Sequence, residues 1–134
     1  MTKSRRFYAV GVSHKTATID HRGYFSLSDS QLHALFLDAK EKGIQDLLLI
    51  NTCNRTEIYA WTFSDTELVE LLCTHSEGTQ DSFNKIGYSF EDEKGIHHLF
   101  RVGTGLESQI LGDFEIIGQI KQSFYRSKKM GLAQ

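Results

Sequence analysis

The sequence contains no proline, only two cysteines and no long apolar run. No stretch approaches the roughly 20 apolar residues that a membrane-spanning helix needs, so we do not expect a membrane protein. Residues 7–12 are apolar, but they are too few for the core of a secretory signal. Because free thiols persist in a reducing compartment, we expect a cytoplasmic protein in which Cys53 and Cys73 do not pair.

An excess of charge of one sign is also missing. The formal net charge is -2 at pH 7, and 40% of the 134 residues are hydrophobic, which is typical of one globular domain with a single core. Composition therefore does not predict binding to nucleic acid by charge. Four cations lie near the C-terminus, where they favour the dipole of a helix end: Lys121, Arg126, Lys128 and Lys129.

The first third of the chain predicts a strand followed by a helix. Residues 7–12 have strand composition, and Gly11 indicates a close approach of backbone or ligand. Apolar residues then recur at helical spacing, with Ser28 or Asp29 as the N-cap and Gly43 as the stop.

The middle of the chain predicts two strands, a helix and a further strand. Residues 47–50 form a short apolar run, and residues 58–63 are rich in aromatic and β-branched residues. A polar turn at 51–55 joins the two segments. Residues 66–75 predict a helix, and residues 85–90 can supply the last strand.

The resulting order βαββαβ predicts an α+β fold: a ferredoxin-like antiparallel sheet with both helices on one face. A helical C-terminal section is expected to follow, because apolar residues step at helical spacing beyond Glu91. The single domain thus divides into a sheet part at about 1–90 and a helical part at about 91–134.

The polar turn carries the residues of greatest chemical interest. Cys53 follows a buried strand, and the guanidinium of Arg55 two residues away can favour the nucleophilic thiolate. A free cysteine is more often a small buried hydrophobe, so from spacing alone both interpretations stay open. Cys73 lies among leucines, and we interpret it as a core residue.

Two kinds of cofactor site are not predicted in this chain. Cys53, Cys73, His97 and His98 can in principle bind a metal, but none lies at a tight ligand spacing. The segment Gly103-Thr104-Gly105 lacks the third glycine of a dinucleotide-binding turn.

Three separated segments resemble the signature segments of glutamyl-tRNA reductases. They are GVSHKTA at residues 11–17, NTCNRTEIY at 51–59, and HLFRV at 98–102 leading to GLESQILGD at 105–113. Their order and combination cover nearly the whole chain, and the combination is far more specific than a lone cysteine turn.

The resemblance implies the N-terminal catalytic domain of an NADPH-dependent reductase that performs the first committed step of tetrapyrrole (haem) synthesis. In that family a cysteine attacks the ester of glutamyl-tRNA, and the thioester is reduced to glutamate-1-semialdehyde. By resemblance Cys53 is the nucleophile and His98 assists catalysis. The implied glutamate pocket comprises Thr52, Asn54, Arg55, Ser108, Asp113, Phe114, Glu115 and Gln119.

Parts of this pocket depart from the family pattern, or have a plainer interpretation from the residues alone. Asp113-Phe114-Glu115 stands where the family usually has Glu-Pro-Gln, and Arg22-Gly23 where it has Arg-Glu. From the residues alone the plainer interpretation is favoured for each of them: Arg55 as a solvated turn residue, Ser108 and Gln119 as helix-surface residues, and His98 as a packed structural histidine.

The resemblance also implies what lies outside this chain. NADPH is expected to bind a missing C-terminal domain, and a further missing domain is expected to form a homodimer. Glutamyl-tRNA is the expected substrate, and the aminomutase of the next step is a possible partner.

Two alternatives come from other functional classes. A ferredoxin-like sheet also carries non-catalytic RNA- or ligand-binding modules, but Phe7, Tyr8, Tyr59 and Trp61 do not form an RNP-like pattern. A self-contained cysteine hydrolase needs a base and an oxyanion site, which His98 and the backbone of the Cys53 turn can supply.

Overall fold

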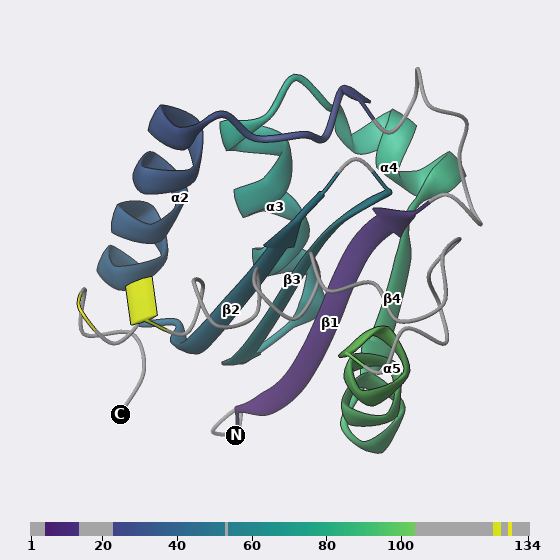
Figure 1. The fold of residues 1–134 in the computed structure, drawn as a ribbon. Helices are drawn as coiled ribbons and strands as arrows, with labels where there is room; N and C mark the ends of the chain where they lie inside the picture. The colour runs from purple at the N-terminus through teal and green to yellow at the C-terminus, as the bar shows by residue number, and fades with distance from the viewer. Residues whose placement is uncertain (1–4, 14–22, 53, 104–124, 127–128, 130–134) are drawn as a thin grey trace.

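The computed structural model describes residues 5–13, 23–52, 54–103, 125–126 and 129. Figure 1 shows a sheet of strand order β2-β3-β1-β4, flanked by helices. The described elements are β1 (Arg6–Ser13), α2 (Asp29–Glu41), β2 (Gln45–Asn51), β3 (Arg55–Thr62), α3 (Asp65–His75), α4 (Gln80–Ile86), β4 (Tyr88–Glu91) and α5 (Glu93–Gly103). None of the helices in these ranges is both long and apolar enough to span a membrane.

All three strand pairs of the sheet are antiparallel. β1 pairs with β3 on one side and with β4 on the other, and β3 also pairs with β2. Helix α2 connects β1 to β2, whereas α3 and α4 connect β3 to β4. The predicted α+β class with an antiparallel sheet is confirmed.

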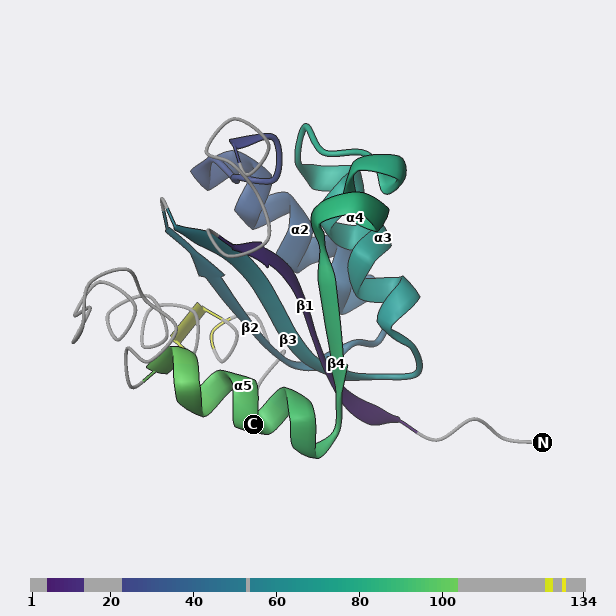
Figure 2. The ribbon, with the colours of Figure 1, turned by 90° about the vertical axis from the view of Figure 1, so that its right-hand side faces the viewer.

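Helices cover both faces of the sheet, as Figure 2 shows. Helices α2 and α3 cover the face that holds the larger core, where Val10 and Ile58 of the central strands pack against Leu35 and Leu72. Helix α5 covers the opposite face. There Val102 belongs to a smaller apolar cluster with residues of β1, β2 and β3: Ala9, Ile50 and Tyr59.

The ends of α2 follow the predicted local signals. The Ser28 side chain accepts a hydrogen bond from the Gln31 N–H, and the Gln31 side chain accepts one from the Ser28 N–H, which forms a capping box. Gly43 has φ +73°, a backbone conformation that favours glycine and ends the helix. Of the two predicted N-caps, Ser28 and Asp29, the structure has Ser28, and the predicted stop at Gly43 is confirmed.

The predicted strand at residues 85–90 is wrong at its beginning. Lys85 and Ile86 belong to α4, which begins where the Thr79 side chain accepts a hydrogen bond from the Ser82 N–H. Phe83 anchors this helix by packing edge-on against Phe25 in the larger core. A helix of seven residues is too short to display a periodic pattern in sequence.

Two further predictions concern segment boundaries. β3 begins at Arg55, three residues before the predicted start, so the last residue of the expected polar turn at 51–55 is strand. The helical section predicted after about residue 91 is represented by α5, and residues 104–124 lie outside the described part of the chain.

Candidate active site

Alternate residues of β3 project onto the face that α5 covers, because successive strand residues point to opposite faces. These are Arg55, Glu57 and Tyr59, of which Tyr59 packs in the smaller cluster. Glu57 lies opposite Gly11 of β1. A Cβ atom at position 11 would lie 2.8 Å from Glu57 Cγ and 2.4 Å from the Thr56 carbonyl oxygen, so only glycine fits there.

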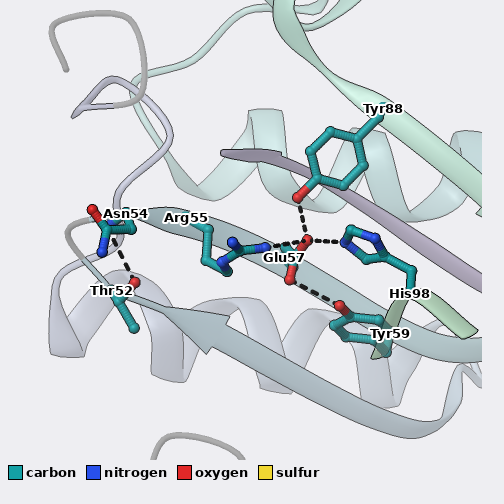
Figure 3. Close-up of polar contacts among 7 residues, drawn as sticks. All are labelled: Thr52, Asn54, Arg55, Glu57, Tyr59, Tyr88 and His98. Atoms are coloured by element: carbon teal, nitrogen blue, oxygen red, sulfur yellow. Dashed lines mark hydrogen bonds and ion pairs between the residues drawn. The ribbon is translucent and has the colours of Figure 1, made fainter. Parts of the chain in front are cut away.

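Glu57 is the centre of a buried polar cluster, and only 1% of it is exposed (Figure 3). The Tyr59 hydroxyl donates to Oε1 over 2.8 Å, and the Tyr88 hydroxyl donates to Oε2. Arg55 Nη1 lies 3.4 Å from Oε2, and His98 Nε2 lies 2.6 Å from the same oxygen. Four side chains from β3, β4 and α5 therefore converge on one carboxylate.

The neighbours of Glu57 keep it ionised. Burial raises the pKa of Glu57, but the hydrogen bond and charge of His98, the charge of Arg55 and the Tyr88 hydroxyl together outweigh burial and lower it. For Tyr59 and Tyr88, burial and the negative charge of Glu57 raise the pKa well above its ordinary value. Both tyrosines thus remain protonated hydrogen-bond donors.

His98 is held by rings as well as by Glu57. Its side chain is 12% exposed, and its ring centroid lies 4.7 Å from that of Phe90, 5.2 Å from that of Tyr88 and 6.4 Å from that of Tyr59. His98 lies at the edge of the face that α5 buries, whereas its neighbour His97 is exposed. Such packing restricts the imidazole to one orientation.

The turn that precedes this cluster is fixed by its own hydrogen bonds. The Thr52 N–H donates to the Arg55 carbonyl oxygen over 2.9 Å, and the Asn54 N–H donates to Thr52 Oγ1 over 3.2 Å. Asn51 ties the same turn to the chain before α2, since its amide donates to the Leu27 carbonyl oxygen over 2.7 Å. Thr52 and Asn54 therefore hold defined positions on either side of residue 53.

The structure brings together some of the predicted site residues. Thr52 and Asn54 lie directly before Arg55, the first residue of β3, and His98 shares the carboxylate of Glu57 with Arg55. The solvated-turn alternative for Arg55 is wrong, because the residue is only 2% exposed. The remaining predicted site residues lie outside the described part of the chain: Cys53, Ser108, Asp113, Phe114, Glu115 and Gln119.

Cys73 behaves as the core residue that the sequence predicts. It is partly buried on α3 and packs against the larger core, and burial raises the pKa of its thiol. A raised pKa disfavours the nucleophilic thiolate.

Sequence reasoning missed the central role of Glu57 and its contacts with Tyr59 and Tyr88. One signal was present: Arg55, Glu57 and Tyr59 alternate at strand spacing, which places two opposite charges and a phenol on one face. The contribution of Tyr88 depends on strand pairing, because Gly11 lies between Glu57 of β3 and Tyr88 of β4.

The family model for the N-terminal domain of glutamyl-tRNA(Glu) reductase matches residues 10–134. The chain belongs to this family. A glutamyl-tRNA reductase of Christiangramia forsetii is 48% identical over 132 residues, and glutamyl-tRNA reductase 2 of Flavobacterium johnsoniae is 49% identical over 132 residues. Each alignment covers 98% of this chain, and 32% and 30% of those proteins.

A solved structure of a family member has the same fold. The glutamyl-tRNA reductase from Methanopyrus kandleri superposes with a TM-score of 0.75 at 26% identity, over 99% of this chain and 30% of that chain. The present chain therefore spans about a third of the length of the family members that it matches.

Proposed function

We propose that this chain is the catalytic domain of a glutamyl-tRNA reductase, and that Cys53 forms a thioester with glutamate in the first committed step of tetrapyrrole synthesis. The observation that carries the proposal is the position of the family's cysteine motif. In the sequence Cys53 stands two residues before Arg55, and Arg55 and Glu57 build a buried cluster with His98. Buried, mutually paired ionisable groups beside a nucleophile are typical of active sites.

The proposed step is an acyl transfer. The thiolate of Cys53 attacks the ester carbonyl of glutamyl-tRNA, a C–S bond forms, and the C–O bond to the ribose breaks. The ribose oxygen leaves with the electron pair and takes up a proton. His98 either supplies this proton or assists the reaction by orienting the ester carbonyl. The acyl group keeps its oxidation state, so no oxidant or reductant enters this step.

The glutamate pocket belongs to the same proposal. Thr52 and Asn54 offer hydroxyl and amide groups, and the guanidinium of Arg55 suits a substrate carboxylate. The further pocket residues implied by the family are Ser108, Asp113, Phe114, Glu115 and Gln119.

The described residues do not fit NADPH. Its dinucleotide site in other proteins uses parallel strands and a glycine-rich turn that opens a helix, whereas the strand pairs described for this chain are all antiparallel. We therefore derive no reduction step from these residues and assign NADPH binding to a part of the protein beyond this chain. We likewise assign the expected homodimer contacts and the contact with the downstream aminomutase to parts of the protein beyond this chain. We propose that the enzyme is cytoplasmic.

The sheet topology is compatible with this proposal, whereas an RNA-binding module is not. We propose that the sheet is of the ferredoxin-like class, since β2-β3-β1-β4 with antiparallel neighbours matches a βαββαβ chain in which α3 and α4 share one crossover.

An RNA-binding module of that class would need aromatic residues on an open sheet face. Tyr59 is fully buried under α5, which argues against such a module.

Mass spectrometry of the chain tests the covalent step. After incubation with glutamyl-tRNA and rapid acid quench, we expect the added mass of one glutamyl group on a peptide that contains Cys53. Cys53→Ser should abolish the adduct, and in the full-length enzyme it should abolish semialdehyde formation, because a serine hydroxyl is almost wholly un-ionised near neutral pH. Cys73→Ser is the matched control and should keep the adduct. An adduct that survives Cys53→Ser would refute the mechanism.

A further inference from the structure

We propose that Glu57 is a positioning residue that keeps a hydrogen on Nε2 of His98, so that Nδ1 is the nitrogen that gains and loses protons. The chemical use of that nitrogen rests on the proposed function. The assignment of the hydrogen itself does not, because it follows from the contacts of one buried carboxylate and can be measured without substrate.

Glu57 can only accept hydrogen bonds. An ionised carboxylate has no hydrogen to donate, and a guanidinium has no acceptor atom. Arg55 and the protonated hydroxyls of Tyr59 and Tyr88 already direct their hydrogens at the two oxygens of Glu57. Against the effect of burial, the hydrogen bond and charge of His98, the charge of Arg55 and the hydrogen bond from Tyr88 lower the pKa of Glu57.

The imidazole of His98 is the hydrogen-bond donor in its contact with Glu57. His98 Nε2 lies 2.6 Å from Glu57 Oε2, a hydrogen-bonding distance at which one partner must donate. Since the ionised carboxylate cannot, Nε2 carries the hydrogen. A neutral imidazole has one hydrogen on its nitrogens, so its lone pair lies on Nδ1.

The imidazole of His98 stays in the orientation that directs Nε2 towards Glu57. Phe90, Tyr88 and Tyr59 surround the imidazole, and a rotated ring would turn a carbon towards the carboxylate. A second partner that fixes the tautomer and orientation of a functional histidine is a recurring arrangement in enzyme sites.

The charges of the cluster give this arrangement a chemical consequence. Glu57 and Arg55 balance each other, so a proton on Nδ1 gives the cluster a net positive charge. In the proposed acyl transfer, that proton is the one available to the leaving ribose oxygen.

Nitrogen-15 NMR of the histidine-labelled chain measures the proposal directly, with His98→Asn used to assign the signals. We expect the Nε2 signal to report a bound hydrogen at every pH at which the chain is folded, and only Nδ1 to titrate. Glu57→Gln should preserve this pattern, because its amide oxygen can still accept from Nε2–H while its amide group faces Tyr59. Glu57→Leu removes the acceptor and should abolish the preference.

Acylation rates then connect the tautomer to function. We expect Glu57→Gln to slow glutamyl transfer to Cys53 less than Glu57→Leu, which should slow it by about 10²-fold or more. Glu67→Gln is the matched control, because Glu67 is a half-buried carboxylate that accepts from Thr62, away from His98. It should leave both the NMR pattern and the rate unchanged.

The outcomes separate this inference from the proposed function. Titration of Nε2 in the wild-type chain would overturn the role of Glu57 even if Cys53 is acylated. If the Leu variant does not fold, the wild-type and Gln spectra still decide the assignment. Absence of any glutamyl adduct on wild-type Cys53 would refute the proposed function and leave the tautomer result intact.

Discussion

Nε2 of His98 on α5 lies 2.6 Å from Oε2 of Glu57 on β3, although 41 residues separate them in sequence. The contact joins the start of β3 to helix α5 on the covered face of the sheet, because Arg55, the first residue of β3 and two positions after Cys53 in the sequence, pairs with the same oxygen of Glu57. Changes at either end of this contact should therefore affect the chemistry proposed for the turn.

Replacing His98 by asparagine should slow the acylation of Cys53 by about 10²-fold or more, because proton exchange at the leaving oxygen is lost. Alkylation of Cys53 by iodoacetamide should stay nearly unchanged, since a cysteine thiol is partly ionised near neutral pH without a base. Quenched-flow acylation and alkylation rates measure the two effects. If stability and activity fell together, His98 would have a purely structural role.

Arg55→Lys should be poorly tolerated although it keeps the charge. A lysine ammonium is a point donor and cannot reproduce the planar two-bond contact that a guanidinium makes with a carboxylate. We expect the kcat/KM for glutamyl-tRNA in the full-length enzyme to fall by an amount on the order of 2 kcal/mol in transition-state stabilisation. Kinetics equal to those of the wild type would show that Arg55 does not bind the substrate.

The lowered pKa of Glu57 predicts a stability that depends on pH. The folded pKa lies below the ordinary value of 4.5, so the stabilisation is fully present above that value and is lost as the pH falls through the folded pKa. The free energy of unfolding of the wild type should therefore exceed that of Glu57→Gln most clearly near neutral pH. Urea unfolding at several pH values measures this difference, and a difference that grows on acidification would contradict the prediction.

Gly11→Ala should destabilise the chain by about 1–3 kcal/mol, because the new methyl group overlaps the Thr56 carbonyl oxygen and the Glu57 side chain. Gly23→Ala is the control, since a Cβ atom there meets nothing within 4 Å, and its effect should stay within about 0.5 kcal/mol. Thermal unfolding of both variants compares them. Equal stability of the two would mean that the strands separate at Gly11 without cost.

Local signals were sufficient to predict several elements. The capping box at Ser28 and the positive φ at Gly43 bound α2 with interactions that span only a few residues, so the sequence reveals them. The family resemblance indicated Cys53 and His98 as candidate catalytic residues, and their segments are recognisable because each carries several unusual residues in a fixed order.

The central position of Glu57 in the site could not be predicted in the same way. Glu57 acquires its role through the pairing of Gly11 with both β3 and β4, and through a helix that returns across the sheet to bring His98 to it. Such contacts depend on strand register and on tertiary packing, which leave no periodic mark in the sequence. The start of β3 at Arg55 was missed for a related reason. Charged residues such as Arg55 and Glu57 are typical of a polar turn, and only their buried partners show that they belong to a strand.

The alternation along β3 has a consequence for how this domain can change in length. Arg55, Glu57 and Tyr59 face α5, whereas Ile58 and Ala60 face the larger core. An insertion or deletion of one residue inside β3 would exchange the two sets, burying both charges among aliphatic side chains and turning isoleucine towards His98. Natural length variation should therefore be confined to loops, while the number of residues from the cysteine turn to Tyr59 should be the same in every functional relative.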